Sequence, residues 1–399
     1  MEKSNLPFLE NFKFNRIELA GSLGDLGTLL PIVLGMILIN KLSPSAVFLS
    51  FGLLYILTGC YFKLPVPVQP LKAVGAIAIA YPAMITESVI SASGIIFGSL
   101  MLLFYFTGIV DKLAKFFTQP VVRGIQLALG LVFLRKGIEL IVNKNLFMSH
   151  ASAASTGFNV NLIIGILVFV MVLMLLDNKK LPAAIAAVGV GILTGFIFDG
   201  FKGQNFSMGP TRIRLIFPSL NDFWLAFSML ILPQIPLTIG NSCVGTADTC
   251  SILFPGNPLL GKTKPGNFAL TMGLVNLPAG FLGAVPMCHG TGGLAAHYRF
   301  GARTGGAPLM IGALFLLTAL LFGEFGFSVL AMIPNSVLGV LLIFAGLELC
   351  PLIRSLKTNE EYFVALLISG ISLAVPNMGW AFGIGILVDI VIRKAKIKI

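Results

Sequence analysis

The sequence has few charged residues for its length. Only 11% of its 399 residues are charged, whereas 56% are hydrophobic. A typical soluble domain carries about 25% charged residues, so this shortage argues against a soluble protein. The net charge is +11, but no basic stripe alternates with aromatic residues along the chain. We therefore expect no nucleic-acid partner.

Residue types that bind metals or form disulfides are also scarce. The five cysteines lie in or beside apolar runs and form no CxxC pair, which gives no disulfide framework. The three histidines do not cluster, so we predict no metal site and no cofactor. Cys288 and His289 are adjacent, but neighbours on one turn rarely converge on one substrate atom, and no third orienting group is apparent. We therefore do not expect an enzyme.

What the chain does contain is long uncharged runs. Residues 223–247 include no charged side chain, and about 20 mostly apolar residues suffice to cross a bilayer as a helix. The polar segment Met1 to Arg16 lacks a small-residue cleavage site, so we predict no removable signal peptide. These features predict an all-α polytopic integral membrane protein, which we place in the plasma membrane.

Apolar periods divide the chain into about fourteen spans. Two of them, 68–82 and 289–299, are too short to cross as helices. A proline-containing extended stretch precedes each, at 65–68 and 284–287, and proline disfavours helix in the residue before it. Each therefore predicts a short strand leading into a half-helix. The spans are 17–39, 46–62, 68–82, 89–109, 119–141, 161–176, 182–198, 223–247, 267–284, 289–299, 306–323, 327–349, 361–375 and 378–392.

Two pairs of prolines indicate an internal repeat. Pro67 and Pro286 are separated by nearly the same number of residues as Pro120 and Pro334. Two halves of seven spans would be inverted relative to each other, because seven is odd. We predict an N-terminal segment 1–16, a first repeat 17–220, a second repeat 221–392 and a basic tail 393–399. Lysine and arginine concentrate in alternate connectors, which places both termini in the cytoplasm.

Interrupted segments at matching positions of two repeats point to a transporter's binding site. The free N–H groups at the start of a half-helix, together with its dipole, favour a bound anion. At the first half-helix Gln69 can donate through its amide, and Lys72 is a cation in an apolar segment. A buried cation is expensive and hence functional by default. Lys72 contacts the anion, or it extends to the interface or pairs with a carboxylate.

The second half-helix begins with a glycine-rich turn. Gly290 and Gly292 let the backbone approach a ligand, and Thr291 adds a hydroxyl donor. His289 donates to an oxyanion, titrates, or caps the turn. The sequence leaves these three roles open.

Spans 17–39 and 223–247 occupy matching places in the two repeats, and both carry polar residues. Asp25 is an intramembrane carboxylate. It is a proton or cation site that couples transport, a helix-end carboxylate, or a partner for Lys72 or Arg123. Gln234 and Asn241 lie with Thr238 and Ser242 on the second span. They line the pathway or hydrogen-bond between helices.

Four segments together resemble a known family. They are Gly24-Asp25-Leu26-Gly27-Thr28-Leu29-Leu30-Pro31, Pro65-Val66-Pro67-Val68-Gln69-Pro70-Leu71-Lys72-Ala73, Pro233-Gln234-Ile235-Pro236-Leu237-Thr238 with Asn241-Ser242, and Pro286-Met287-Cys288-His289-Gly290-Thr291-Gly292-Gly293-Leu294 continuing to Arg303. They are similar to the molybdate transporter family, a branch of the sulfate permease group. The matches lie in both halves, and the last block is long and unusual.

The resemblance implies a seven-plus-seven inverted-repeat fold with a core and a gate domain, as in uracil and sulfate permeases. It implies secondary active uptake of molybdate, and no cytoplasmic STAS domain. A sulfate or general oxyanion permease is the alternative function. An anion channel is a weaker alternative, and so is a nucleobase permease, because glutamate is absent from both half-helix regions. The expected partners are a molybdate or sulfate anion and the lipid bilayer. The sequence allows a homodimer but does not fix the oligomeric state.

Overall fold

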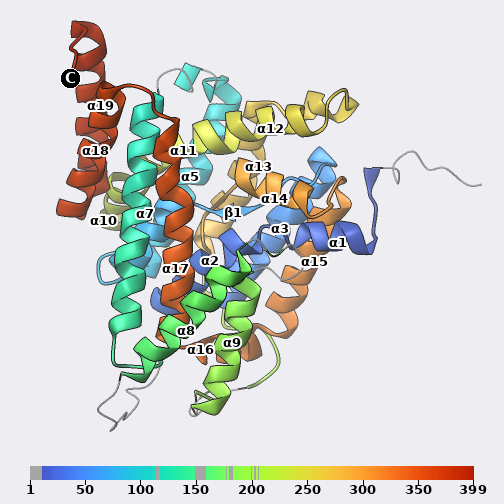
Figure 1. Ribbon diagram of the computed structural model, residues 1–399. Helices are drawn as coiled ribbons and strands as arrows, with labels where there is room; N and C mark the ends of the chain where they lie inside the picture. The colour runs from blue at the N-terminus through green and yellow to red at the C-terminus, as the bar shows by residue number, and fades with distance from the viewer. Residues whose placement is uncertain are drawn as a thin grey trace, which may run out of the picture.

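The computed structural model describes residues 11–110, 112–113, 117–148, 159–176, 178, 183–198, 200–201, 204 and 206–399. The chain is mostly helical, as predicted (Figure 1). Its first part contains α1 (Arg16–Ser22), α2 (Leu26–Ile39), α3 (Pro44–Phe62), β1 (Gln69–Pro70), α4 (Lys72–Ala80), α5 (Glu87–Thr107), α7 (Gln119–Val142), α8 (Val160–Leu175) and α9 (Ala183–Ile197).

The second part begins with one long helical run. It consists of α10 (Leu220–Leu225), η2 (Ala226–Ile231), α11 (Leu232–Leu237), η3 (Thr238–Gly245) and α12 (Thr246–Leu253). The remaining elements are η4 (Pro258–Lys262), α13 (Pro265–Phe281), β2 (Met287–Cys288), α14 (Thr291–Arg299), α15 (Gly306–Leu321), α16 (Gly323–Ala331), α17 (Asn335–Leu349), η5 (Cys350–Ser355), α18 (Asn359–Ala374) and α19 (Met378–Ala395).

The long run from Leu220 to Leu253 contains two π-helical stretches, η2 and η3. They flank α11, which includes Pro233 and Pro236. A proline ring clashes with the carbonyl four residues earlier and removes one hydrogen bond. Wider π turns accommodate such breaks and are frequent at functional sites.

Three helix pairs form the frame. Helix α5 packs along α13, α3 along α15, and α7 along α17; Figure 1 shows the last pair side by side. Glycines let the backbones of α7 and α17 approach closely: Gly130 faces Gly346, and Gly137 faces Gly339. Without a hydrophobic drive between helices in lipid, such small-residue contacts supply the packing.

The two strands form a ribbon inside the protein. β1 and β2 pair antiparallel, with Gln69 opposite Cys288 and Pro70 opposite Met287. All four residues are buried. Each strand leads into a nine-residue helix, α4 or α14. The predicted pair of strands followed by half-helices is therefore present. The first half-helix starts at Lys72, two residues after Pro70.

Buried side chains satisfy the outer edges of this ribbon. The Asn276 amide accepts from the backbone N–H of Met287 at 2.7 Å and donates to the Met287 carbonyl at 2.7 Å. On the other strand, Tyr55 donates to the Val68 carbonyl at 3.1 Å. His297 Nδ1 donates to the Pro65 carbonyl at 3.0 Å. Backbone groups away from water need such partners.

The predicted count of fourteen spans is not confirmed. Within the described residues, four helices are long and apolar enough to cross a membrane: Pro44–Phe62, Glu87–Thr107, Leu220–Leu253 and Asn335–Ser355. The number rises to six if two bent pairs each count as one span, α1 with α2 at 48° and α15 with α16 at 91°.

Two predicted spans are interrupted. The segment 17–39 breaks between α1 and α2, where Gly24 packs against Phe300 so closely that a side chain would not fit. The segment 327–349 breaks between α16 and α17. Pro334 precedes α17 there and disfavours helix at Ile333.

The glycine contact between α7 and α17 predicts a stability effect. A Cβ atom at position 339 would lie 2.5 Å from the Gly137 carbonyl oxygen. We expect Gly339→Leu to destabilise the protein by about 1–3 kcal/mol through overpacking, seen as a lower melting temperature in detergent. Gly370→Leu is the control, because a side chain there meets nothing within 4 Å. Equal melting temperatures for the two variants would contradict this account of the packing.

Candidate anion-binding site

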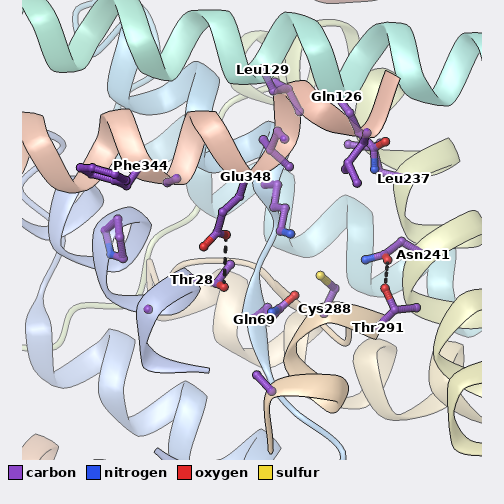
Figure 2. Close-up of a pocket in the computed structure, with 18 of the residues that line it drawn as sticks. Thr28, Gln69, Gln126, Leu129, Leu237, Asn241, Cys288, Thr291, Phe344 and Glu348 are labelled. Carbon is purple, nitrogen blue, oxygen red and sulfur yellow. Dashed lines mark hydrogen bonds between the residues drawn. The ribbon is translucent and has the colours of Figure 1, made fainter. Parts of the chain in front are cut away.

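A cavity of about 820 Å³ lies beside the ends of both strands (Figure 2). One wall is polar and comes from the strands, the half-helices and the π-helical segment η3. The opposite wall comes from α7, α8, α9 and α17. The polar wall includes Thr28, Gln69, Lys72, Gln234, Asn241, Ser242, Cys288, Thr291 and Gly292.

Helix α4 begins at the cavity without a side-chain cap. Its second N–H, from Ala73, donates to Gln234 Oε1 at 2.9 Å, and Gln234 Nε2 donates to Thr238 Oγ1 at 3.1 Å. Gln234 therefore both lines the cavity and bonds between helices, so the structure combines the two roles that the sequence left open. Lys72 is the first residue of α4 and lines the cavity, half-buried. Its charge adds to the positive end of the helix dipole.

Helix α14 also begins at the cavity without a side-chain cap. Gly290 precedes it in an extended conformation, and Gly292 is exposed in the cavity wall. The Thr291 hydroxyl donates to Asn241 Oδ1 at 2.7 Å, which fixes both side chains on the same wall (Figure 2). The first N–H groups of a helix have no intrahelical acceptor. Two such helix starts therefore border one cavity.

Asp25 and Gln69 form a buried pair behind this wall. Gln69 Nε2 lies 2.9 and 2.8 Å from the two Asp25 carboxylate oxygens. A Cβ atom on Gly293 would overlap Asp25, and one on Gly290 would overlap Gln69. Glycine is required at both places because the pair lies directly on the backbone of α14. Gln69 lines the cavity, whereas Asp25 does not belong to its surface.

His289 lies away from the cavity and is fully buried. Its Nδ1 donates to the Pro67 carbonyl at 2.9 Å, and its Nε2 lies 2.9 Å from Thr271 Oγ1. Both ring nitrogens are thus occupied by the protein. The structure therefore supports a role in holding β1, and contact between His289 and an anion stays an untested prediction.

The wall opposite the half-helices contains two polar residues that the sequence did not single out, Gln126 on α7 and Glu348 on α17. Arg123, considered above only as a partner for Asp25, also lies there on α7. Arg123 donates to Ser355 Oγ and to Gln126 Oε1, both at 2.8 Å. A sequence signal existed for Glu348, because it is a carboxylate that follows directly on the uncharged run 325–347.

The described charges around the cavity favour an anionic ligand. Lys72, Arg123 and Arg299 line it, together with one carboxylate, Glu348. Among the described residues, no group of three or more histidine, cysteine, aspartate or glutamate side chains could hold a metal ion. The cavity thus offers cations, amides, hydroxyls and helix N-termini, a donor set suited to an oxyanion.

Comparison with known proteins agrees with a cavity suited to an oxyanion. A family model described as "Molybdate transporter of MFS superfamily" matches residues 17–133 and 226–349. Molybdate transporter 2 of Arabidopsis thaliana is 30% identical, over 94% of this chain and 87% of the relative. Molybdate transporter 1 of Chlamydomonas reinhardtii is 26% identical, over 92% of this chain and 90% of the relative.

Solved structures match nearly the whole chain. The transmembrane domain of a cyanobacterial bicarbonate transporter, BicA, superposes with a TM-score of 0.64 at 12% identity, covering 98% of each chain. SLC26A9 superposes with a TM-score of 0.70 at 14% identity, covering 98% of this chain and 67% of that one. These likenesses concern the fold. The family description names the MFS superfamily, whereas the fold is that of BicA and SLC26A9.

The segments that carried the family resemblance, from Gly24 to Arg303, lie largely within the matched residues. Apolar helices, a cavity suited to anions and the folds of known anion transporters agree with the family match. The chain is therefore an integral membrane anion transporter and belongs to the molybdate transporter family.

Proposed function

We propose that the protein is a secondary active transporter that takes up molybdate by alternating access. One observation carries the proposal: the starts of α4 and α14 border the same cavity, with Lys72 on the first and Thr291 on the second. The relatives in Arabidopsis and Chlamydomonas are named molybdate transporters, which supports molybdate as the substrate.

In this proposal the oxyanion lies between the two helix starts. Lys72 supplies a full positive charge, and the first N–H groups of both helices supply donors. Thr291 and Asn241 orient the anion, while Gln234 holds the first turn of α4 in place. Gln69 reaches the anion only if its amide leaves Asp25. The same site accepts other tetrahedral dianions, so a sulfate or general oxyanion permease is the alternative.

The cavity lies toward one end of α7 and of α17. Its residues on α7 all fall between Gln119 and Leu129, and those on α17 between Leu341 and Leu349. Beyond them, Gly137 and Gly339 bring the same two helices into backbone contact. The ends of α7 and α17 that line the cavity are the ones that the charge distribution predicts to be cytoplasmic. We infer an inward-facing conformation, in which transport requires α7 and α17 to move relative to the half-helices.

Two inverted repeats of seven spans account for the helix contacts. If α3 and α13 are equivalent, and α5 and α15 are equivalent, then the pair α3–α15 corresponds to the pair α13–α5. The strands β1 and β2 pair with each other across the same axis. Because these contacts map onto each other when the two repeats are interchanged, they support a repeat boundary near residue 220, where α10 begins. Cytoplasmic termini, the plasma membrane and a homodimer remain part of the proposal.

We expect saturable uptake of radiolabelled molybdate into proteoliposomes containing the purified protein. Excess tungstate should block uptake, since it is a tetrahedral dianion of similar size, whereas sulfate should compete weakly and uracil not at all. Equal inhibition by sulfate would instead indicate a general oxyanion carrier. Absence of saturable uptake would overturn the proposed function.

Gly292 provides a test of where the anion lies. A Cβ atom there meets no protein atom within 4 Å and would project beside the cavity. We expect Gly292→Ala to fold normally, because alanine favours helix, yet to weaken molybdate uptake at least about tenfold by crowding the anion. Gly189→Ala, also unobstructed but on α9 outside the cavity lining, is the control. Unchanged uptake by Gly292→Ala would move the anion away from α14.

Uptake of a dianion needs coupling to an energy source. A membrane potential of about −100 mV opposes entry by roughly 2.3 kcal/mol per charge. We propose Asp25 as the coupling group, because it is a buried carboxylate that contacts cavity residue Gln69. Asp25→Asn should then lose the pH dependence of molybdate uptake in a pH series from 5.5 to 8. A pH profile equal to that of the unaltered protein would rule out Asp25 as the proton site.

A further inference from the structure

Glu348 is a carboxylate in a cavity that otherwise presents cations and neutral donors. It is exposed on α17, in the wall opposite the half-helices. Figure 2 shows it extending toward Thr28, whose hydroxyl lies 3.5 Å from Glu348 Oε2. A fixed negative charge beside a bound dianion opposes binding. The proposed anion site alone therefore does not explain why a carboxylate lines this cavity.

We propose that Glu348 acts as a tethered counter-charge for Lys72 in the anion-free site and competes with the incoming oxyanion. This inference rests on the proposed function. Lys72 lies close enough for its charge to act on both Asp25 and Glu348. Lys72 and Glu348 line the same cavity, from α4 and from α17, whereas Asp25 lies behind Gln69.

The two carboxylates differ in their freedom to move. Asp25 is buried, and both of its oxygens accept from Gln69. Glu348 makes one long contact, to Thr28. Neither of the two described salt bridges, Lys136–Glu139 and Arg393–Asp389, involves Glu348 or Lys72. Of these two carboxylates, Glu348 is the one held by fewer and longer hydrogen bonds, so it is the one suited to exchange at Lys72.

Competition between Glu348 and the anion for Lys72 would link anion binding to the position of α17, the helix that carries Glu348. An empty site keeps Lys72 neutralised by a group on α17, which avoids an isolated charge within the membrane. An arriving dianion replaces that group and breaks the attraction between α17 and α4. The described charged groups that bear on this exchange are Lys72 on α4, Arg123 on α7, Arg299 on α14 and Asp25 behind Gln69.

The test is equilibrium binding of molybdate to the purified protein in nanodiscs. Glu348→Gln keeps the size and polarity of the side chain but removes its charge. We expect it to bind molybdate at least about tenfold more tightly than the unaltered protein, because a repulsive charge is lost. Glu348→Ala should shift affinity in the same direction. Glu139→Gln, which removes an exposed carboxylate outside the cavity, should leave affinity unchanged.

The outcomes separate this inference from the proposed function. Tighter binding by both Glu348 variants, with the melting temperature retained, supports the counter-charge. Saturable binding whose affinity is unchanged or weaker in Glu348→Gln would overturn the inference and leave the proposed function standing. If the unaltered protein shows no saturable molybdate binding, the proposed function fails, and the inference fails with it.

Discussion

The structure depends on satisfying the backbone of a two-residue ribbon that is buried within the protein. A strand pair this short leaves most of its outer N–H and C=O groups unpaired, and each would be costly in a membrane. Asn276 substitutes for a third strand beside Met287. Tyr55, His289 and His297 serve the carbonyls of the segment before β1. The prolines in these segments reduce the number of unpaired backbone groups, because a proline has no backbone N–H that needs an acceptor.

Once the ribbon is fixed, the site follows from it. Each strand directs a half-helix whose N-cap residue makes no side-chain cap, so the starts of both helices border one cavity, with the Ala73 N–H of α4 bonded to Gln234. Gln69 belongs to β1 and also lines the cavity. It donates to Asp25, and both side chains lie against the backbone at the start of α14. Close contacts between glycines, such as Gly137 with Gly339, hold the surrounding helices together with little side-chain volume. Polar donors therefore face a wall formed by separate helices, an arrangement suited to alternating access.

The sequence predicted the parts of this arrangement that depend on local chemistry. Prolines in short apolar segments indicated the strands and half-helices, and Lys72, singled out as a cation in an apolar segment, lines the cavity at the start of α4. The sequence could not show which side chains complete the ribbon. His289 looked like a ligand for the anion because it adjoins the glycine turn, yet its ring nitrogens point to Pro67 and Thr271. Glu348 escaped notice because its importance comes from facing Thr28, far away in sequence. Hydrophobic periodicity also did not reveal the break before α17, where the chain turns at a proline.

The central claim is that the starts of α4 and α14 together bind the oxyanion. Anomalous X-ray diffraction at the molybdenum absorption edge, from crystals grown with molybdate, tests it most directly. The account predicts one anomalous peak within the cavity, in contact with Lys72 and the first turn of α14. A peak located only elsewhere, such as the second hollow lined by Thr358 and Arg393, would contradict it.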